Sequence, residues 1–166
     1  PGQTDLETSA QVVVNEIVKR GGRAVANYEA VDAVNAGERI IQQALLTFGH
    51  IDIVVANAAA PQASTFHKQS VEEFMAIFNV GFSGTLQLLH AAWSHLRSQR
   101  YGRVIAMTSS AGRYGNHGLG AYAASKGAIE MLMRSLAAEG LSNDIRVNAI
   151  SPYANTQMTE AYLKPE

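Results

Sequence analysis

Three short apolar runs, each followed by small or polar residues, constrain the fold of this chain most. They cover residues 51–56 (IDIVVA), 103–107 (RVIAM) and 145–150 (IRVNAI). Short apolar runs bounded by turn residues are typical of strands buried in a parallel sheet. Because helical patterns separate the runs along the chain, the sequence predicts an α/β fold with helices on both faces of the sheet.

Amphipathic segments provide those helices. In residues 34–48 the apolar side chains recur at helical spacing, and the segment ends at Gly49, a residue type that commonly terminates helices. Residues 23–28 (RAVANY) are predicted as a further short strand. The remaining helices are predicted over residues 5–20, 71–99 and 121–139.

The composition is that of a globular polypeptide, and we interpret residues 1–166 as one partial domain. Hydrophobic residues make up 47% and charged residues 16% of the chain, which excludes a disordered chain. The net charge of −1 and the lack of a basic run argue against a nucleic-acid partner. No apolar run is long enough to span a membrane. Cysteine is absent and the five histidines lack metal-ligand spacing, so we expect no metal site.

Small and polar residues follow each of the three predicted strands. Asn57 and Ala58 follow the first, Ser109 lies just beyond the second, and Pro152 and Tyr153 lie just beyond the third. In sheets of this kind, ligands bind beyond the carboxyl ends of the strands. Tight turns alone would explain small residues at one strand end. Their recurrence at three ends favours a cofactor that lies against the backbone.

Tyr122 and Lys126 are the sharpest candidates for chemistry. They are four residues apart, so both lie on one face near the start of a predicted helix. A free tyrosine hydroxyl titrates at about 10, and a neighbouring ammonium lowers that value by favouring the phenolate. Ser109, at a strand end 13 residues before Tyr122, could donate a hydrogen bond to a substrate oxygen that develops negative charge.

Three motifs together resemble the short-chain dehydrogenase/reductase family. They are an Asn-Ala pair after a strand (Asn57), the spacing Ser-x12-Tyr-x3-Lys (Ser109, Tyr122 and Lys126), and the sequence RVNAISP that ends at Pro152. The resemblance covers nearly the whole chain. It implies a Rossmann-type fold and hydride transfer to or from a nicotinamide. In this family Tyr122 would transfer a proton, Lys126 would assist it and hold the nicotinamide ribose, and Ser109 would position the substrate oxygen.

The resemblance implies further contacts. It assigns to the coenzyme Asn57, Ala58, Tyr122, Lys126, Pro152, Tyr153 and Thr156. It assigns to the substrate Ser109, Tyr114 and His117, of which the last two suit an exposed loop equally well. It also implies a homodimer formed through the helices at residues 71–99 and 121–139.

The chain departs from the family pattern in two respects. Gly81 lies 41 residues before Tyr122, where the family usually has a fourth catalytic residue, an asparagine. The family's first two strands, its glycine-rich phosphate loop and its last strand are not found in the sequence. We therefore predict a Rossmann-type doubly wound parallel sheet that lacks these parts. In the strand order 3-2-1-4-5-6, the strand predicted at residues 23–28 would then have no neighbour.

A closer resemblance is to the dehydrogenase domain of the peroxisomal multifunctional enzymes of type 2, carried by segments such as FGHIDIVVANAA and ISPYANTQMTE. It implies an oxidoreductase that converts (3R)-3-hydroxyacyl-CoA to 3-ketoacyl-CoA in fatty-acid β-oxidation, with NAD as coenzyme and NADP as the alternative. Other interpretations are a carbonyl or ketoacyl reductase with another substrate, or a truncated, non-catalytic relative that acts as an interaction protein. The expected location is the peroxisome or the cytoplasm, although no targeting signal is visible.

Overall fold

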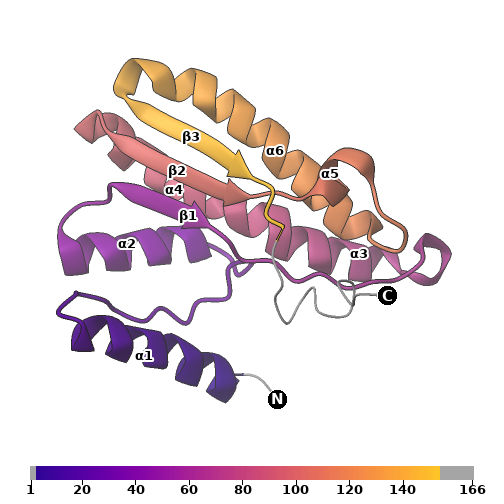
Figure 1. Cartoon of the computed structure of the whole chain (residues 1–166), viewed down its shortest axis with the longest axis horizontal. Coiled ribbons are helices and arrows are strands. Elements are labelled where there is room, and N and C mark those ends of the chain that lie inside the picture. Colours follow the sequence, from indigo (N-terminus) through magenta and orange to yellow (C-terminus); the bar gives the residue numbers. More distant parts are fainter. Residues whose placement is uncertain (1–2, 154–166) are drawn as a thin grey trace.

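The computed structural model describes residues 3–153, in which two α-helices precede each of three strands along the chain (Figure 1). The sheet strands are β1 (Ile53–Ala56), β2 (Gly102–Met107) and β3 (Ile145–Ile150). The α-helices of this part are α1 (Gln3–Lys19), α2 (Ala36–Phe48), α3 (Val71–Phe78), α4 (Gly84–Gln99), α5 (Ser110–Tyr114) and α6 (Gly120–Gly140). Short 3-10 turns lie at Phe66–Lys68 and Leu141–Asn143.

The three strands form one parallel sheet in the order β1-β2-β3. In the ladder Val54 lies opposite Val104, which lies opposite Val147 on the far side. All three strands therefore end at the same edge of the sheet, as predicted from the three apolar runs. The predicted α/β class with a parallel sheet is confirmed.

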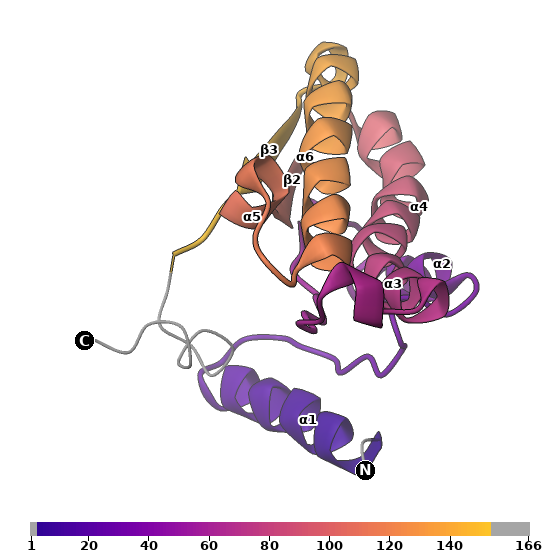
Figure 2. The same cartoon turned by 90° about the vertical axis from the view of Figure 1, so that its right-hand side faces the viewer.

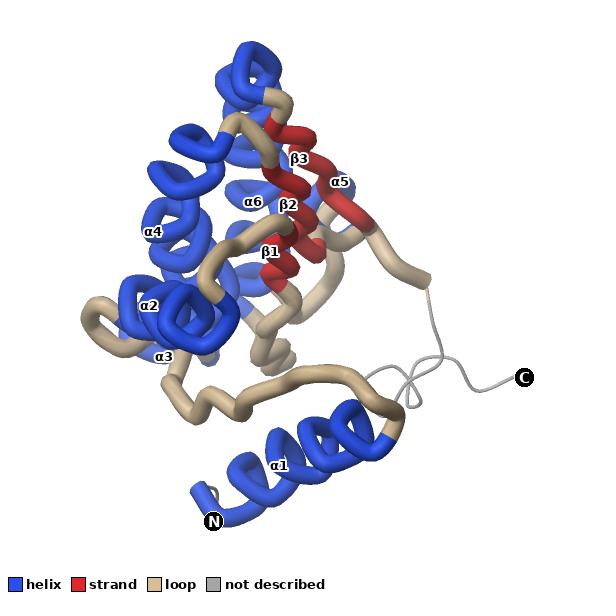
Figure 3. Tube along the Cα trace, turned by 90° about the vertical axis from the view of Figure 1, so that its left-hand side faces the viewer, coloured by secondary structure: helices blue, strands red, loops and turns tan. Residues whose placement is uncertain are grey.

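Helices cover one face of the sheet. Helices α4 and α6 lie along this face (Figures 2 and 3). Val54 and Val104 are buried in one core with Leu89 of α4 and Ile129 of α6. The alternate residues of β1 point to the opposite face, where Val55 is 50% exposed. Helices were predicted on both faces of the sheet. Within residues 3–153 they cover one face, and the second face presents apolar side chains to solvent.

The strand predicted at residues 23–28 is wrong. These residues have no regular secondary structure and lie between α1 and α2. One of their backbone carbonyls, that of Ala26, accepts a 2.9 Å hydrogen bond from the Gln43 side chain of α2 rather than from a neighbouring strand. A strand exists only where a neighbouring strand accepts its hydrogen bonds, and the described residues supply none at this position. The preceding helix α1 lies apart from the sheet (Figure 1).

The helix predicted over residues 71–99 is interrupted. It begins with a capping box, in which Ser70 accepts from the Glu73 backbone N–H and Glu73 accepts from that of Ser70. One π-helical turn, Asn79–Ser83, then separates α3 from α4. A Cβ on Gly81 within this turn would lie 2.7 Å from the Ser125 hydroxyl of α6. The sequence position that usually carries asparagine in the family is therefore packed closely against α6.

Candidate active site

Lys126 is the most unusual polar residue of the described structure. It lies on α6, is only 2% exposed, and donates a 2.7 Å hydrogen bond from Nζ to the Met107 carbonyl at the end of β2. Its ammonium lies 5.6 Å from the centroid of the Tyr122 ring. Burial lowers the pKa of Lys126 from its ordinary value of 10.5. An ammonium carries three donors, so this group retains donors for further acceptors beside the strand end.

Ser109 lies where β2 passes into α5. Its hydroxyl accepts a 3.2 Å hydrogen bond from the Ala111 backbone N–H and so caps the amino end of that short helix. The preceding Thr108 donates 3.0 Å from its hydroxyl to the Lys126 carbonyl and 2.8 Å from its N–H to the Ile150 carbonyl. These bonds join the ends of β2 and β3 to the turn of α6 that carries Lys126.

A contact between glycines brings α5 against α6 beside the lysine. A Cβ on Gly112 would lie 2.7 Å from both the Gly127 nitrogen and the Lys126 carbonyl carbon. Both of these are backbone atoms that cannot rotate away. Only a residue without a side chain fits at this crossing, so Gly112 sets the distance between the segment after Ser109 and the helix of Tyr122 and Lys126.

The other predicted coenzyme residues surround the same edge. Asn57 and Ala58 directly follow β1 and are exposed. Pro152 and Tyr153 lie just beyond β3, where Tyr153 is 90% exposed. Thr156 lies outside the described residues.

The two predicted substrate residues lie between Ser109 and Tyr122. Tyr114 ends α5 and is 83% exposed, and His117 is exposed in the loop that leads to α6. Both side chains are therefore accessible to a ligand. Their contact with substrate stays a prediction.

Sequence reasoning missed the residues that hold the site together. Helix α5 was interpreted as part of a loop, and neither Gly112 nor an ion pair between Arg113 and Glu130 was singled out. Glu130 and Arg134 are four residues apart on one helix, a spacing that indicates a pair. Arg113 comes from another helix, and no sequence spacing reveals its contact with Glu130.

Two searches of the described residues bear on other classes of site. None of their helices is long and apolar enough to cross a membrane. The same residues contain no group of three or more histidine, aspartate or glutamate side chains placed to hold a metal ion.

The fold and the candidate site together define a class of protein. Its features are a parallel sheet and, at the carboxyl edge of that sheet, a buried lysine one helical turn from a tyrosine. Comparison with known protein families identifies this class. The model of the short chain dehydrogenase family matches residues 4–166. The chain therefore belongs to the short-chain dehydrogenase family.

Two curated relatives match almost the whole chain. Peroxisomal multifunctional enzyme type 2 of Mus musculus is 44% identical over 156 residues, which are 94% of this chain and 21% of that protein. The putative short-chain type dehydrogenase/reductase Rv0148 of Mycobacterium tuberculosis is 44% identical over 157 residues, which are 95% of this chain and 55% of that protein.

Solved structures agree with the fold. An NAD+-bound xylitol dehydrogenase superposes with a TM-score of 0.87 at 26% identity, covering 93% of this chain and 61% of that chain. A short chain dehydrogenase from Mycobacterium avium superposes with a TM-score of 0.85 at 36% identity, covering 90% and 53%. The chain therefore spans little more than half of these solved relatives, in agreement with the predicted partial Rossmann-type sheet.

Proposed function

We propose that this chain carries the catalytic and nicotinamide-side residues of an oxidoreductase that transfers a hydride between a nicotinamide coenzyme and a secondary alcohol or ketone. The observation that carries the proposal is the buried Lys126 ammonium, held on the Met107 carbonyl beside the Tyr122 ring. Among the described residues this cation has no carboxylate partner. Burial of such a cation lowers stability, so a site retains it for a chemical purpose more readily than for packing.

The residues present fit part of a nicotinamide coenzyme. Lys126 has donors to spare for ribose hydroxyls, and the exposed Asn57 and Ala58 leave backbone accessible at the neighbouring strand end. The 166 residues contain no glycine-rich loop directly after a strand, so we assign no pyrophosphate contact to them. The proposed contacts therefore concern the nicotinamide and its ribose, and NAD is the proposed coenzyme.

The mechanism follows from the three candidate catalytic residues. When bound, the nicotinamide supplies the hydride acceptor or donor. Tyr122 takes the proton of the substrate hydroxyl during oxidation and returns it during reduction. The Lys126 ammonium, 5.6 Å from the centroid of the Tyr122 ring, would stabilise negative charge that develops on the Tyr122 oxygen during the proton transfer. Ser109 donates a hydrogen bond to the substrate oxygen, where negative charge develops once the proton has left.

For the substrate we propose (3R)-3-hydroxyacyl-CoA, which would be oxidised to 3-ketoacyl-CoA. The likeness to the mouse multifunctional enzyme supports this choice, as does a relative from Saccharomyces cerevisiae named peroxisomal hydratase-dehydrogenase-epimerase, which is 41% identical. We propose that Tyr114 and His117 contact the acyl-CoA, and their exposure between Ser109 and Tyr122 supports this. The same relatives support the peroxisome as the proposed location.

We also propose a homodimer that uses α3, α4 and α6. Leu86 on α4 is 40% exposed and Met131 on α6 is 55% exposed, so both helices retain apolar side chains outside the monomer core. Leu89 of α4, by contrast, is 2% exposed and belongs to that core.

The experiment is a coenzyme and substrate matrix on the full-length protein. We expect NADH formation with NAD and (3R)-3-hydroxybutyryl-CoA, and little with the (3S) isomer. Activity only with NADPH and a ketone would replace the substrate proposal with that of a carbonyl or ketoacyl reductase. An absence of turnover with either coenzyme would contradict the oxidoreductase proposal and favour the interaction protein.

A further inference from the structure

A buried carboxylate joins the two helices of the candidate site. Glu130 on α6 is only 4% exposed. Its Oε2 accepts a 2.8 Å hydrogen bond from Arg113 Nε on α5, and its Oε1 accepts a 2.9 Å hydrogen bond from Arg134 Nη2 on α6. Both carboxylate oxygens are thus occupied by guanidinium groups, the stronger kind of hydrogen bond.

The two arginines have different positions in the fold. Arg134 is one turn from Glu130 on the same helix, so this bond only links neighbouring turns of α6. Arg113 is the fourth residue of the five-residue α5 and reaches across to α6. Removing Arg113 therefore breaks a link between elements, while removing Arg134 leaves that link in place.

The Arg113–Glu130 pair lies beside the candidate catalytic residues along both helices. On α6, Glu130 follows Lys126 by one turn. On α5, Arg113 follows Gly112, which crosses Gly127 too closely for any Cβ. The Gly112 N–H in turn donates a 3.0 Å hydrogen bond to the carbonyl of Ser109.

The glycine crossing limits how closely α5 approaches α6. The ion pair one residue away adds a directional contact between the same two helices, which resists sliding or turning of α5 about the crossing. Ser109 caps the first turn of α5, so the orientation of this short helix bears directly on the position of Ser109.

We propose that Glu130 is a positioning residue that, through Arg113, holds Ser109 in register with Tyr122 and Lys126. The inference rests on the proposed function, since it concerns the alignment of the proposed catalytic groups. A displacement of about 1 Å at a reacting group can reduce turnover by up to about a hundredfold, so a positioning contact outside the reaction can matter for rate.

The test compares Arg113→Gln with Arg134→Gln in the full-length protein. Each variant removes one guanidinium from the same carboxylate, so each leaves Glu130 with one remaining partner. We expect Arg113→Gln to lower kcat by about tenfold with little change in the KM for the coenzyme, while Arg134→Gln keeps kcat within about twofold. Hydrogen exchange of the backbone amides of residues 109–115 is expected to accelerate in Arg113→Gln alone.

The positioning role and the proposed function can fail separately in this test. Equal kcat values in the two variants, or equal exchange at residues 109–115, would overturn the positioning role. A wild-type protein without turnover would overturn the proposed function and with it any effect of Glu130 on catalysis. In that case the exchange experiment still determines whether Arg113 fixes α5 against α6.

Discussion

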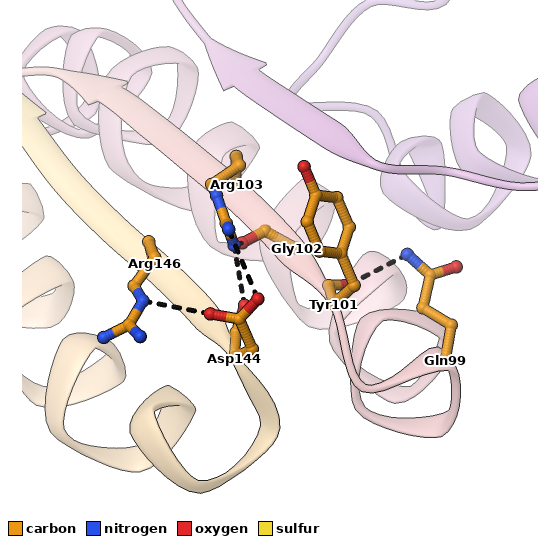
Figure 4. A network of polar contacts seen from close by, with 6 residues as sticks. All are labelled: Gln99, Tyr101, Gly102, Arg103, Asp144 and Arg146. Atoms are coloured by element: carbon orange, nitrogen blue, oxygen red, sulfur yellow. Dashed lines mark hydrogen bonds and ion pairs between the residues drawn. The ribbon is translucent and has the colours of Figure 1, made fainter.

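At the amino ends of β2 and β3, charged side chains pair with one another. At the carboxyl ends, the buried Lys126 ammonium has a backbone carbonyl as its hydrogen-bond partner within residues 3–153. Figure 4 shows the amino-end network, in which Asp144 accepts from Arg103 at 3.3 Å and from Arg146 at 3.1 Å. The Arg103 guanidinium also lies over the Tyr101 ring, 4.4 Å from its centroid. These arginines hold the pKa of Asp144 below its ordinary value of 3.8, Arg103 contributing most.

This difference in charge pairing indicates which end of the sheet can support a reaction. At the amino end the Asp144 carboxylate pairs with two arginines, and the side chains involved are partly exposed, so their effect is mainly local stability. The carboxyl end instead buries the Lys126 ammonium, lowers its pKa, and leaves donors for a ligand. Substitutions at the two ends should therefore have different effects. Substitution of the charged group at the carboxyl end should lower activity, whereas substitutions at the amino end should change stability alone.

The largest expected effect is that of Lys126→Met. We expect kcat to fall by about a hundredfold or more, because the variant removes the cation that lies beside the proposed proton-transferring tyrosine. The unfolding midpoint should stay the same or rise, since a thioether is easier to bury than an ammonium. Steady-state kinetics and thermal denaturation of the full-length protein check both parts. Retained turnover, or a clear loss of stability, would show that the lysine serves the fold.

A second prediction uses glycine substitutions near the site. Gly112→Ala should lower the free energy of unfolding by about 1–3 kcal/mol, because its Cβ would meet α6 backbone atoms at 2.7 Å. Gly120→Ala is the matched control, since its Cβ would meet nothing closer than a Phe74 ring carbon at 3.9 Å. Alanine favours a helix over glycine, so the control should be neutral or slightly more stable. Chemical denaturation measures both, and equal effects would refute the close crossing.

The smallest expected effect belongs to the amino end. Asp144→Asn should leave kcat and KM unchanged and lower stability slightly at neutral pH. Because the pKa of Asp144 is lowered on folding, its contribution is complete above 3.8 and is lost as the pH falls through the lowered value. The stability difference between wild type and Asp144→Asn should therefore shrink on acidification. Denaturation at a series of pH values tests this, and a constant difference would argue against the charge interaction as its source.

Much of the fold could be predicted from local pattern. The helix predicted over residues 34–48 is observed as α2, which ends at the same Phe48, and the three apolar runs are observed as the three strands. The strand predicted at residues 23–28 failed for a reason that no local pattern contains, because strand formation depends on a neighbouring strand. Residues 23–28 are of types that favour strands, but they form an irregular segment between α1 and α2.

The candidate site was predictable in part for the same reason. Tyr122 and Lys126 share a helix, so their spacing already indicates a common face. The burial of Lys126 and the glycine crossing at Gly112 depend on how α5 meets α6, which is a tertiary contact. The close approach of Gly81 to Ser125 of α6 is likewise a tertiary contact, and the sequence indicated only an unusual residue at that position.

Two tyrosines, one at each end of the strands, allow a direct test of whether catalysis takes place at the carboxyl end. Tyr122 lies at the carboxyl end beside Lys126, and Tyr101 lies at the amino end beneath Arg103. Replacing either by phenylalanine removes one hydroxyl and keeps the ring. We expect Tyr122→Phe to lower the kcat for oxidation of (3R)-3-hydroxybutyryl-CoA by NAD by at least about a hundredfold, and Tyr101→Phe to match wild type. If Tyr122→Phe retained wild-type turnover, or if both variants lost it equally, the assignment of catalysis to the carboxyl end would be wrong.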